Sequence, residues 1–228
     1  MMVVILSTPR SGSGYLAELL MQSPDLLHYI GEPFNFDFGY NGIDLTPLYF
    51  DRLDNINRSG NMLLIKDKLS YVGRDEFENS PHIASIVSAY HKHISESFYI
   101  IKLIRKDPFQ QALSACLAET TNMWHMKNNE INEITKPVHI SLDFLKQTLE
   151  IYLIKRRYLI NFQRYDEIVM YEDLTDDNLT NMKLITGLRC PDHEIETKII
   201  KNPDKAALVV NYDDLLNWYR NNKDRYEF

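Results

Sequence analysis

The chain opens with VVILSTPRSGSGYLAELL (residues 3–20), in which three sequence patterns follow one another. Residues 3–6 are a continuous apolar run rich in β-branched side chains, which is typical of a strand buried on both faces of a parallel sheet. Residues 7–14 are turn formers and small polar residues with one arginine among them. From residue 15 the leucines recur three and four positions apart, which places them on one helix face. This stretch therefore predicts a strand, a loop with two glycines, and a helix.

The same alternation continues along the chain. Further strands are expected at 62–65, 98–104 and 168–170, and further helices at 83–93, from Pro108, from 142 after the cap residue Ser141, at 179–186 and at 213–223. Strands that alternate with helices predict an α/β fold with a P-loop-like parallel β-sheet flanked by helices. Because the sequence has no linker, repeat or low-complexity tract, residues 1–228 are expected to form a single domain.

The composition narrows the classes of partner. Lys and Arg number 25 against 32 Asp and Glu, so the formal net charge is −7 and general binding to nucleic acid is not expected. The sequence contains no apolar run near the roughly 18 residues of a membrane span, and its start does not read as a signal peptide. Cys116 and Cys190 lie far apart and are expected to be reduced thiols, as in a cytoplasmic protein.

Two long segments, residues 32–60 and 122–139, lack a clean period. Loops of this length inside one domain usually act as lids or as walls of a substrate site. We therefore expect the residues that contact a substrate to be concentrated in them.

The loop at residues 8–14 is the first candidate anion site. Loops at the carboxyl ends of parallel strands receive ligands, and the N–H groups at the start of the following helix favour a phosphate. Arg10 adds a fixed positive charge there. The alternative is a plain strand-to-helix turn. The lysine that follows the last glycine of an ATP-binding P-loop is missing, which argues against ATP with magnesium.

A second candidate anion site follows the strand at 98–104. Arg105 stands at the end of this strand, and Ser114 lies on the helix after it, so the two could close on one phosphate. The alternative is that Arg105 pairs with Asp107 at the surface and that Ser114 is a packing residue. Two anion sites at one sheet edge suggest a ligand with separated phosphates.

Both segments resemble motifs of the sulfotransferase superfamily. Residues 8–16 resemble its 5′-phosphosulfate loop, and residues 105–114 resemble its 3′-phosphate motif. The run QALS at 111–114 is most similar to the Stf0 (trehalose sulfotransferase-like) type, and YEDL at 171–174 and NWYR at 217–220 match further segments of these families. The matches occur in the expected order along nearly the whole chain.

The resemblance implies a sulfotransferase fold, PAPS (3′-phosphoadenylyl sulfate) as the sulfuryl donor and PAP as its product, with no metal. It implies a 5′-phosphosulfate site formed by Arg10, Ser11, Gly12, Ser13, Gly14 and Tyr15. It assigns Arg105 and Ser114 to the 3′-phosphate. Lys106 departs from the second arginine common in the Stf0 type, and a late Arg-Lys-Gly loop is missing.

The catalytic residues implied are Arg10 and Glu32. Arg10 would neutralise charge on the leaving phosphate oxygen, and Glu32 would take the proton of the acceptor. His125 is a rival base, although we favour acceptor contact or packing for it. Lys66, at a strand end, would add charge near the sulfate or be solvated.

Two other functions remain open. One is a P-loop kinase of nucleosides or small molecules, and the other is a non-catalytic module that binds PAPS or PAP. The acceptor is expected to be a carbohydrate or another small molecule, and a homodimer would be in keeping with the Stf0 type.

Overall fold

The computed structural model describes most of the chain: residues 2–26, 28–31, 63–69, 81–123, 136–174 and 204–226, and residues 55, 72, 79, 177, 181, 188 and 189. Its centre is a parallel sheet in the order β2-β3-β1-β4-β5. The strands are β1 (Met2–Ser7), β2 (His28–Gly31), β3 (Leu63–Asp67), β4 (Phe98–Ile104) and β5 (Glu167–Met170). This sheet with its flanking helices confirms the predicted fold class.

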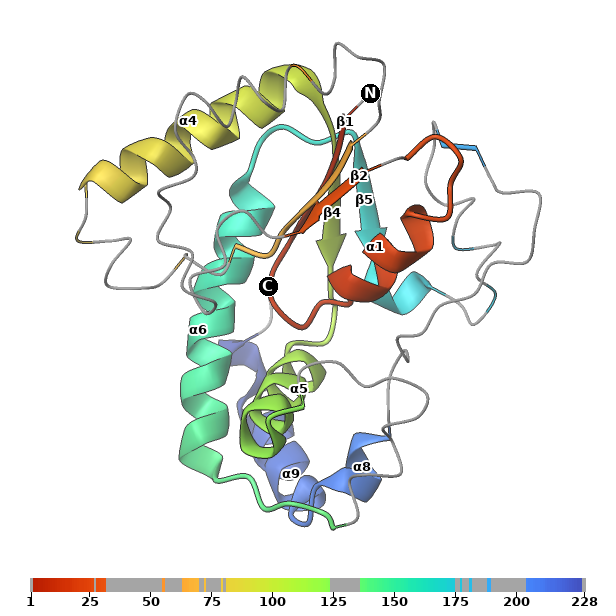
Figure 1. Ribbon diagram of the computed structural model, residues 1–228. Helices are drawn as coiled ribbons and strands as arrows, with labels where there is room; N and C mark the ends of the chain where they lie inside the picture. Colours follow the sequence, from red (N-terminus) through yellow and green to blue (C-terminus); the bar gives the residue numbers. More distant parts are fainter. Residues whose placement is uncertain are drawn as a thin grey trace.

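Helices cover both faces of the sheet and the carboxyl ends of its strands (Figure 1). The helices are α1 (Ser13–Leu20), α4 (Pro81–Ser97), α5 (Pro108–Thr121), α6 (Leu142–Asn161), α8 (Lys205–Leu208) and α9 (Tyr212–Asn222), with short turns η3 (Tyr171–Asp173) and η4 (Lys223–Arg225). Figure 1 shows α4 and one end of α6 on one side of the sheet and α1 on the other. The strands point toward α5, α8 and α9.

The apolar residues of β1 explain why this strand is central. Val3 and Ile5 pack toward α1, whereas Val4 and Leu6 pack toward α4 and α6. Side chains alternate between the two faces of a strand, so a continuous apolar run fits a strand that is buried on both. A third apolar cluster lies beyond the sheet, where α5, α6 and α9 meet around Phe109.

Most predicted elements are present, with differences at short segments. Ser141 caps α6 as expected, accepting a hydrogen bond from the Phe144 N–H at 3.2 Å. Among the elements of the described residues, the strand β2, the helix α8 and the short turns η3 and η4 were not predicted. The helix expected at 179–186 and the long segment 32–60 lie almost wholly outside the described residues, and of the segment 122–139 only residues 122, 123 and 136–139 are described.

Cys116 is a free buried thiol, and burial raises its pKa to about 11. Cys190 lies outside the described residues. Within the described ranges, no helix combines the length and the hydropathy needed to cross a membrane.

Candidate functional site

The loop between β1 and α1 passes directly against an aromatic ring that follows β5. Gly12 has φ 85° and is the N-cap of α1. A Cβ at this position would lie 2.4 Å from two ring carbons of Tyr171. Both the backbone angle and the close contact therefore require glycine. Arg10, two residues earlier, also has a left-handed backbone, with φ 59°.

Hydrogen bonds to buried groups hold this loop in one shape. The Ser11 hydroxyl donates to the Thr8 carbonyl at 2.7 Å. The Gln111 side-chain amide, from α5, donates to Thr8 Oγ1 and to the Pro9 carbonyl, both at 2.7 Å. The cap residue Gly12 offers no side chain to the first-turn N–H groups of α1, which form the positive end of the helix dipole.

Arg10 reaches from the loop to α5. Its Nε and Nη2 both donate to Ser114 Oγ, at 3.2 Å each. Burial lowers the pKa of the Arg10 guanidinium, and the nearby positive charge of Arg105 lowers it further. The group nevertheless stays charged, because an arginine is not deprotonated in proteins.

Arg105 stands next to Arg10, at the end of β4. Its side chain is 6% exposed, and its Nη1 donates to the Arg10 carbonyl at 3.1 Å. The guanidinium carbon lies 4.6 Å from the centre of the Tyr171 ring, within the range of a cation–π contact. Burial lowers the pKa of Arg105, and Tyr171 and Glu172 oppose that shift.

The two expected anion sites are thus one cluster. Arg105 is buried, which rules out the alternative of an arginine at the surface. Ser114, expected beside Arg105, receives the Arg10 guanidinium instead. Its hydroxyl also has one proton that it can donate to another acceptor. The strand order explains the proximity, since β1 and β4 are neighbours and their carboxyl ends meet.

The other expected loop residues have distinct surroundings. Ser13 is buried at the first position of α1, and Gly14 follows it. The Tyr15 ring packs in the apolar cluster behind α1, where its hydroxyl accepts a hydrogen bond from the Asn181 amide at 2.7 Å. Glu32 and His125 lie outside the described residues.

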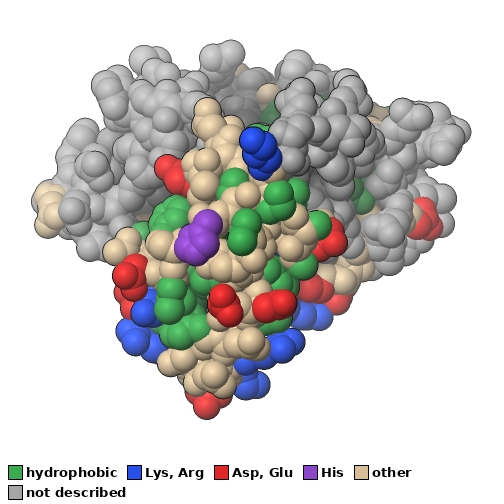
Figure 2. Space-filling model, turned by 90° about the horizontal axis from the view of Figure 1, so that it is seen from below, with side chains coloured by type: hydrophobic (Ala, Val, Ile, Leu, Met, Phe, Trp, Pro, Cys, Tyr) green, Lys and Arg blue, Asp and Glu red, His purple; other side chains and the backbone are tan. Residues whose placement is uncertain are grey.

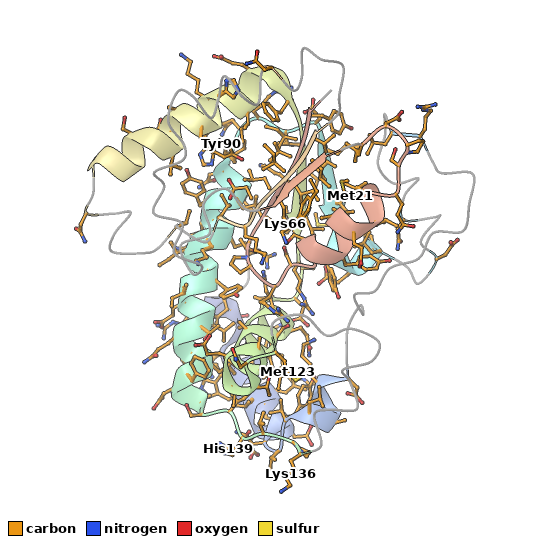
Figure 3. The ribbon with its side chains drawn as sticks, in the orientation of Figure 1. Met21, Lys66, Tyr90, Met123, Lys136 and His139 are labelled. Carbon is orange, nitrogen blue, oxygen red and sulfur yellow. The ribbon has the colours of Figure 1, made fainter. Side chains whose placement is uncertain are left out.

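Lys66 is buried rather than solvated. Its side chain is 5% exposed, and its Nζ lies 6.0 Å from the centre of the Tyr29 ring. Figure 3 shows Lys66 near the middle of the molecule.

A cavity of about 260 Å³ adjoins Arg105. Its wall includes Tyr171 and Lys205, a lysine on α8 that is 6% exposed. Sequence analysis did not single out Lys205. Tyr171 and Gln111 belong to the motifs YEDL and QALS, but the sequence did not predict their contacts with the loop. The Asp204 side chain, which caps α8 by accepting from the Ala206 N–H at 3.0 Å, is the sequence signal that would have indicated a helix start there.

The positive charge of this cluster is internal. Figure 2 shows the face of the molecule below the sheet, where acidic and basic side chains are interspersed around a central group of hydrophobic ones.

Comparison with known proteins supports the fold. No protein-family profile matches the chain, and neither does any curated protein. The structure is similar to a sulfotransferase from Alicyclobacillus acidocaldarius, with TM-score 0.51 and 16% sequence identity over 96% of this chain and 91% of that one. The sulfotransferase domain of the Synechococcus PCC 7002 olefin synthase matches with TM-score 0.44 and 18% identity, over 79% of this chain and 70% of that one.

Proposed function

We propose that this protein is a sulfotransferase that moves a sulfuryl group from PAPS to an acceptor hydroxyl and releases PAP. The observation that carries the proposal is the adjacent pair of the half-buried Arg10 and the buried Arg105 at the carboxyl edge of the sheet. Two like charges held together away from water raise the free energy of the folded protein, and a bound anion offsets that. The shared fold with a sulfotransferase is consistent with this reading.

In the proposed donor site, different residues bind the two phosphate ends of PAPS. The 5′-phosphosulfate would lie over the loop, against Arg10 and the N–H groups of residues 11–15. The Ser11 hydroxyl already donates to Thr8, and the Tyr15 ring is in the core, so these two residues would contribute through their backbone N–H groups. Arg105 and the Ser114 hydroxyl would hold the 3′-phosphate.

The proposed reaction is an in-line displacement at sulfur. A bond forms between the acceptor oxygen and sulfur while the bond from sulfur to the phosphate oxygen breaks, and the electron pair stays on that phosphate oxygen. Arg10 would neutralise the charge that develops there, and the rigid loop would keep the donor aligned. The acceptor proton passes to a base, for which we propose Glu32, with His125 as the alternative.

The finer assignments belong to the same proposal. The resemblance of the sequence motifs favours the Stf0 type, a carbohydrate or other small molecule as the acceptor, and a homodimer. The two cysteines, expected to be reduced thiols, favour a cytoplasmic location. The donor requires no metal in this scheme.

A binding competition tests the proposal against the kinase alternative. PAP should bind without magnesium, and ATP with magnesium should not displace it at comparable concentration. Preferential binding of ATP with magnesium would replace the sulfotransferase proposal by a kinase.

The variant Glu32→Gln separates an enzyme from a binding module. We expect PAP affinity to be unchanged and the rate of sulfuryl transfer from PAPS to fall by about 10²–10⁴-fold, the usual contribution of a general base. His125→Gln is the matched variant and should retain activity. Transfer at the wild-type rate by Glu32→Gln would remove Glu32 from the base role.

A further inference from the structure

We propose that Lys205 is a third cation of the donor site and binds the 3′-phosphate together with Arg105. The inference rests on the proposed function and deepens it by adding a residue from α8, which the sequence motifs do not include. It also makes binding of the nucleotide dependent on pH.

The cavity beside Arg105 supplies the geometry. Arg105, from the end of β4, and Lys205, from α8, line the same cavity of about 260 Å³. Both side chains are 6% exposed. Two buried cations on one cavity favour a doubly charged anion, and a phosphate monoester is a dianion near neutral pH.

Three carboxylates also line this cavity, but each is engaged with backbone N–H groups. Glu172 accepts from the N–H groups of Lys106 and Asp107, at 2.8 and 3.2 Å. Asp107 caps α5 and Asp204 caps α8. All three side chains are exposed, so water screens their charges, whereas the two cations are buried.

Backbone and side-chain hydrogen bonds fix the helix α8, which carries Lys205. Val138 and Val209 form a parallel bridge just after α8, with hydrogen bonds of 2.9 Å from Val138 to Leu208 and from Val210 to Val138. The Asn211 side chain adds two hydrogen bonds to the backbone of Ile140. These contacts fix α8 against the segment that leads into α6, so that Lys205 is held in place before any ligand arrives.

The charges around Lys205 offset its positive charge only poorly. Burial, together with the positive charges of Arg105 and Arg10, lowers its pKa to about 8, although Asp107 and Asp204 oppose this shift. Glu172, Tyr171 and Tyr212 are the other titratable groups on the cavity wall. Among the described residues, no ion pair of Lys205 is found within 4.0 Å.

A phosphate bound beside Lys205 would favour its protonated form. Near pH 8 about half of the free protein carries the proton on Lys205, so that nucleotide binding should take up roughly half a proton per site. PAP affinity should then fall as the pH rises from 7 toward 10.

The experiment is calorimetric titration of the full chain with PAP and with AMP, which lacks the 3′-phosphate. Three variants are compared with the wild type: Lys205→Met, Lys205→Arg, and Lys136→Met as a control at an exposed lysine. At pH 7, Lys205→Met should bind PAP about 10- to 100-fold more weakly and AMP almost unchanged. Lys205→Arg should retain PAP binding without the pH dependence, and Lys136→Met should behave as the wild type.

Titration at pH 8 in two buffers of different ionisation enthalpy gives the proton count. The wild type should take up protons when PAP binds, and Lys205→Met should take up fewer. Equal PAP affinity and equal proton uptake in the wild type and Lys205→Met would overturn the inference while leaving the proposed function intact. Failure of the wild type to bind PAP would overturn the proposed function, and the inference with it.

Discussion

At the scale of single residues, Gly12 shows how an ordinary loop glycine becomes irreplaceable. Its positive φ is unfavourable for any residue with a Cβ, and Tyr171 occupies the space that a Cβ would need. The same Tyr171 ring lies under the Arg105 guanidinium. One aromatic side chain therefore sets the position of both the loop and the second arginine.

Gly12→Ala should accordingly destabilise the protein by about 2–4 kcal/mol, through backbone strain and the overlap with the Tyr171 ring. Urea unfolding followed by circular dichroism measures this change. In a Tyr171→Ala background, Gly12→Ala should lower the free energy of unfolding by less than it does in the wild type, because the ring that the methyl group overlaps is gone. Unfolding of Gly12→Ala at the wild-type urea concentration would contradict the close contact.

At the scale of elements, the site depends on α5 holding the loop after β1. Gln111 is 2% exposed and donates two short hydrogen bonds into that loop, and Ser114 on the same helix receives Arg10. The loop and α5 lie about a hundred residues apart in the sequence. The adjacent placement of β1 and β4 in the sheet brings them together.

Gln111→Leu tests that support because it keeps the size of the side chain and removes both donors. We expect a loss of about 1–3 kcal/mol in the free energy of unfolding, the usual cost of a buried polar group without its partner. PAP affinity should fall about tenfold, since the loop loses its fixed shape. Gln163→Leu, at an exposed position, is the matched control. Unchanged PAP affinity in Gln111→Leu would contradict a role in positioning the loop.

The sequence predicted those elements whose pattern is strong within a short window. The buried runs of β1, β3 and β4 and the spacing of leucines in α1 follow directly from periodicity. β2 (His28–Gly31) was missed because it is short, contains no apolar run, and pairs with β3 through an irregular register. α8 was missed because four residues contain too little of a helical period.

The residues of the candidate site likewise differ in whether a local sequence pattern predicts them. Arg10 and Arg105 were predictable because each follows a recognisable strand. The contact of Arg10 with Ser114 was not, because it depends on how a side chain crosses between two elements. Lys205 has no local signal at all, since its importance arises from burial beside Arg105 in the folded chain.

At the scale of the whole molecule, an acidic protein contains a group of positive charges of which Arg105 and Lys205 are buried and Arg10 is half-buried. The net charge is −7, yet Arg10, Arg105 and Lys205 act on one another below the sheet. Apolar clusters on both faces of the sheet and around α5 stabilise the folded protein, and the repulsion among the three cations opposes that stabilisation. The free energy of unfolding should therefore depend on the protonation of Lys205.

The sign of that dependence follows from the pKa. Burial and the neighbouring Arg105 and Arg10 lower the pKa of Lys205 from 10.5 to about 8, so between these values the unfolded chain binds more protons and stability from this group increases with pH. Lys205→Met should be more stable than the wild type by about 1–3 kcal/mol at pH 7. The difference should shrink toward pH 10, as measured by urea unfolding at several pH values. A difference that is the same at every pH would contradict the repulsion.

The central claim is that this cluster recognises a nucleotide with phosphates at both the 5′ and 3′ positions. Calorimetric titration without magnesium, of PAP against AMP and ADP, tests it most directly. We expect PAP to bind at least about 100-fold more tightly than AMP, a preference that Arg105→Ala removes and that the exposed-site control Arg164→Ala keeps. Equal affinity for PAP and AMP, or a PAP preference that survives Arg105→Ala, would contradict the account.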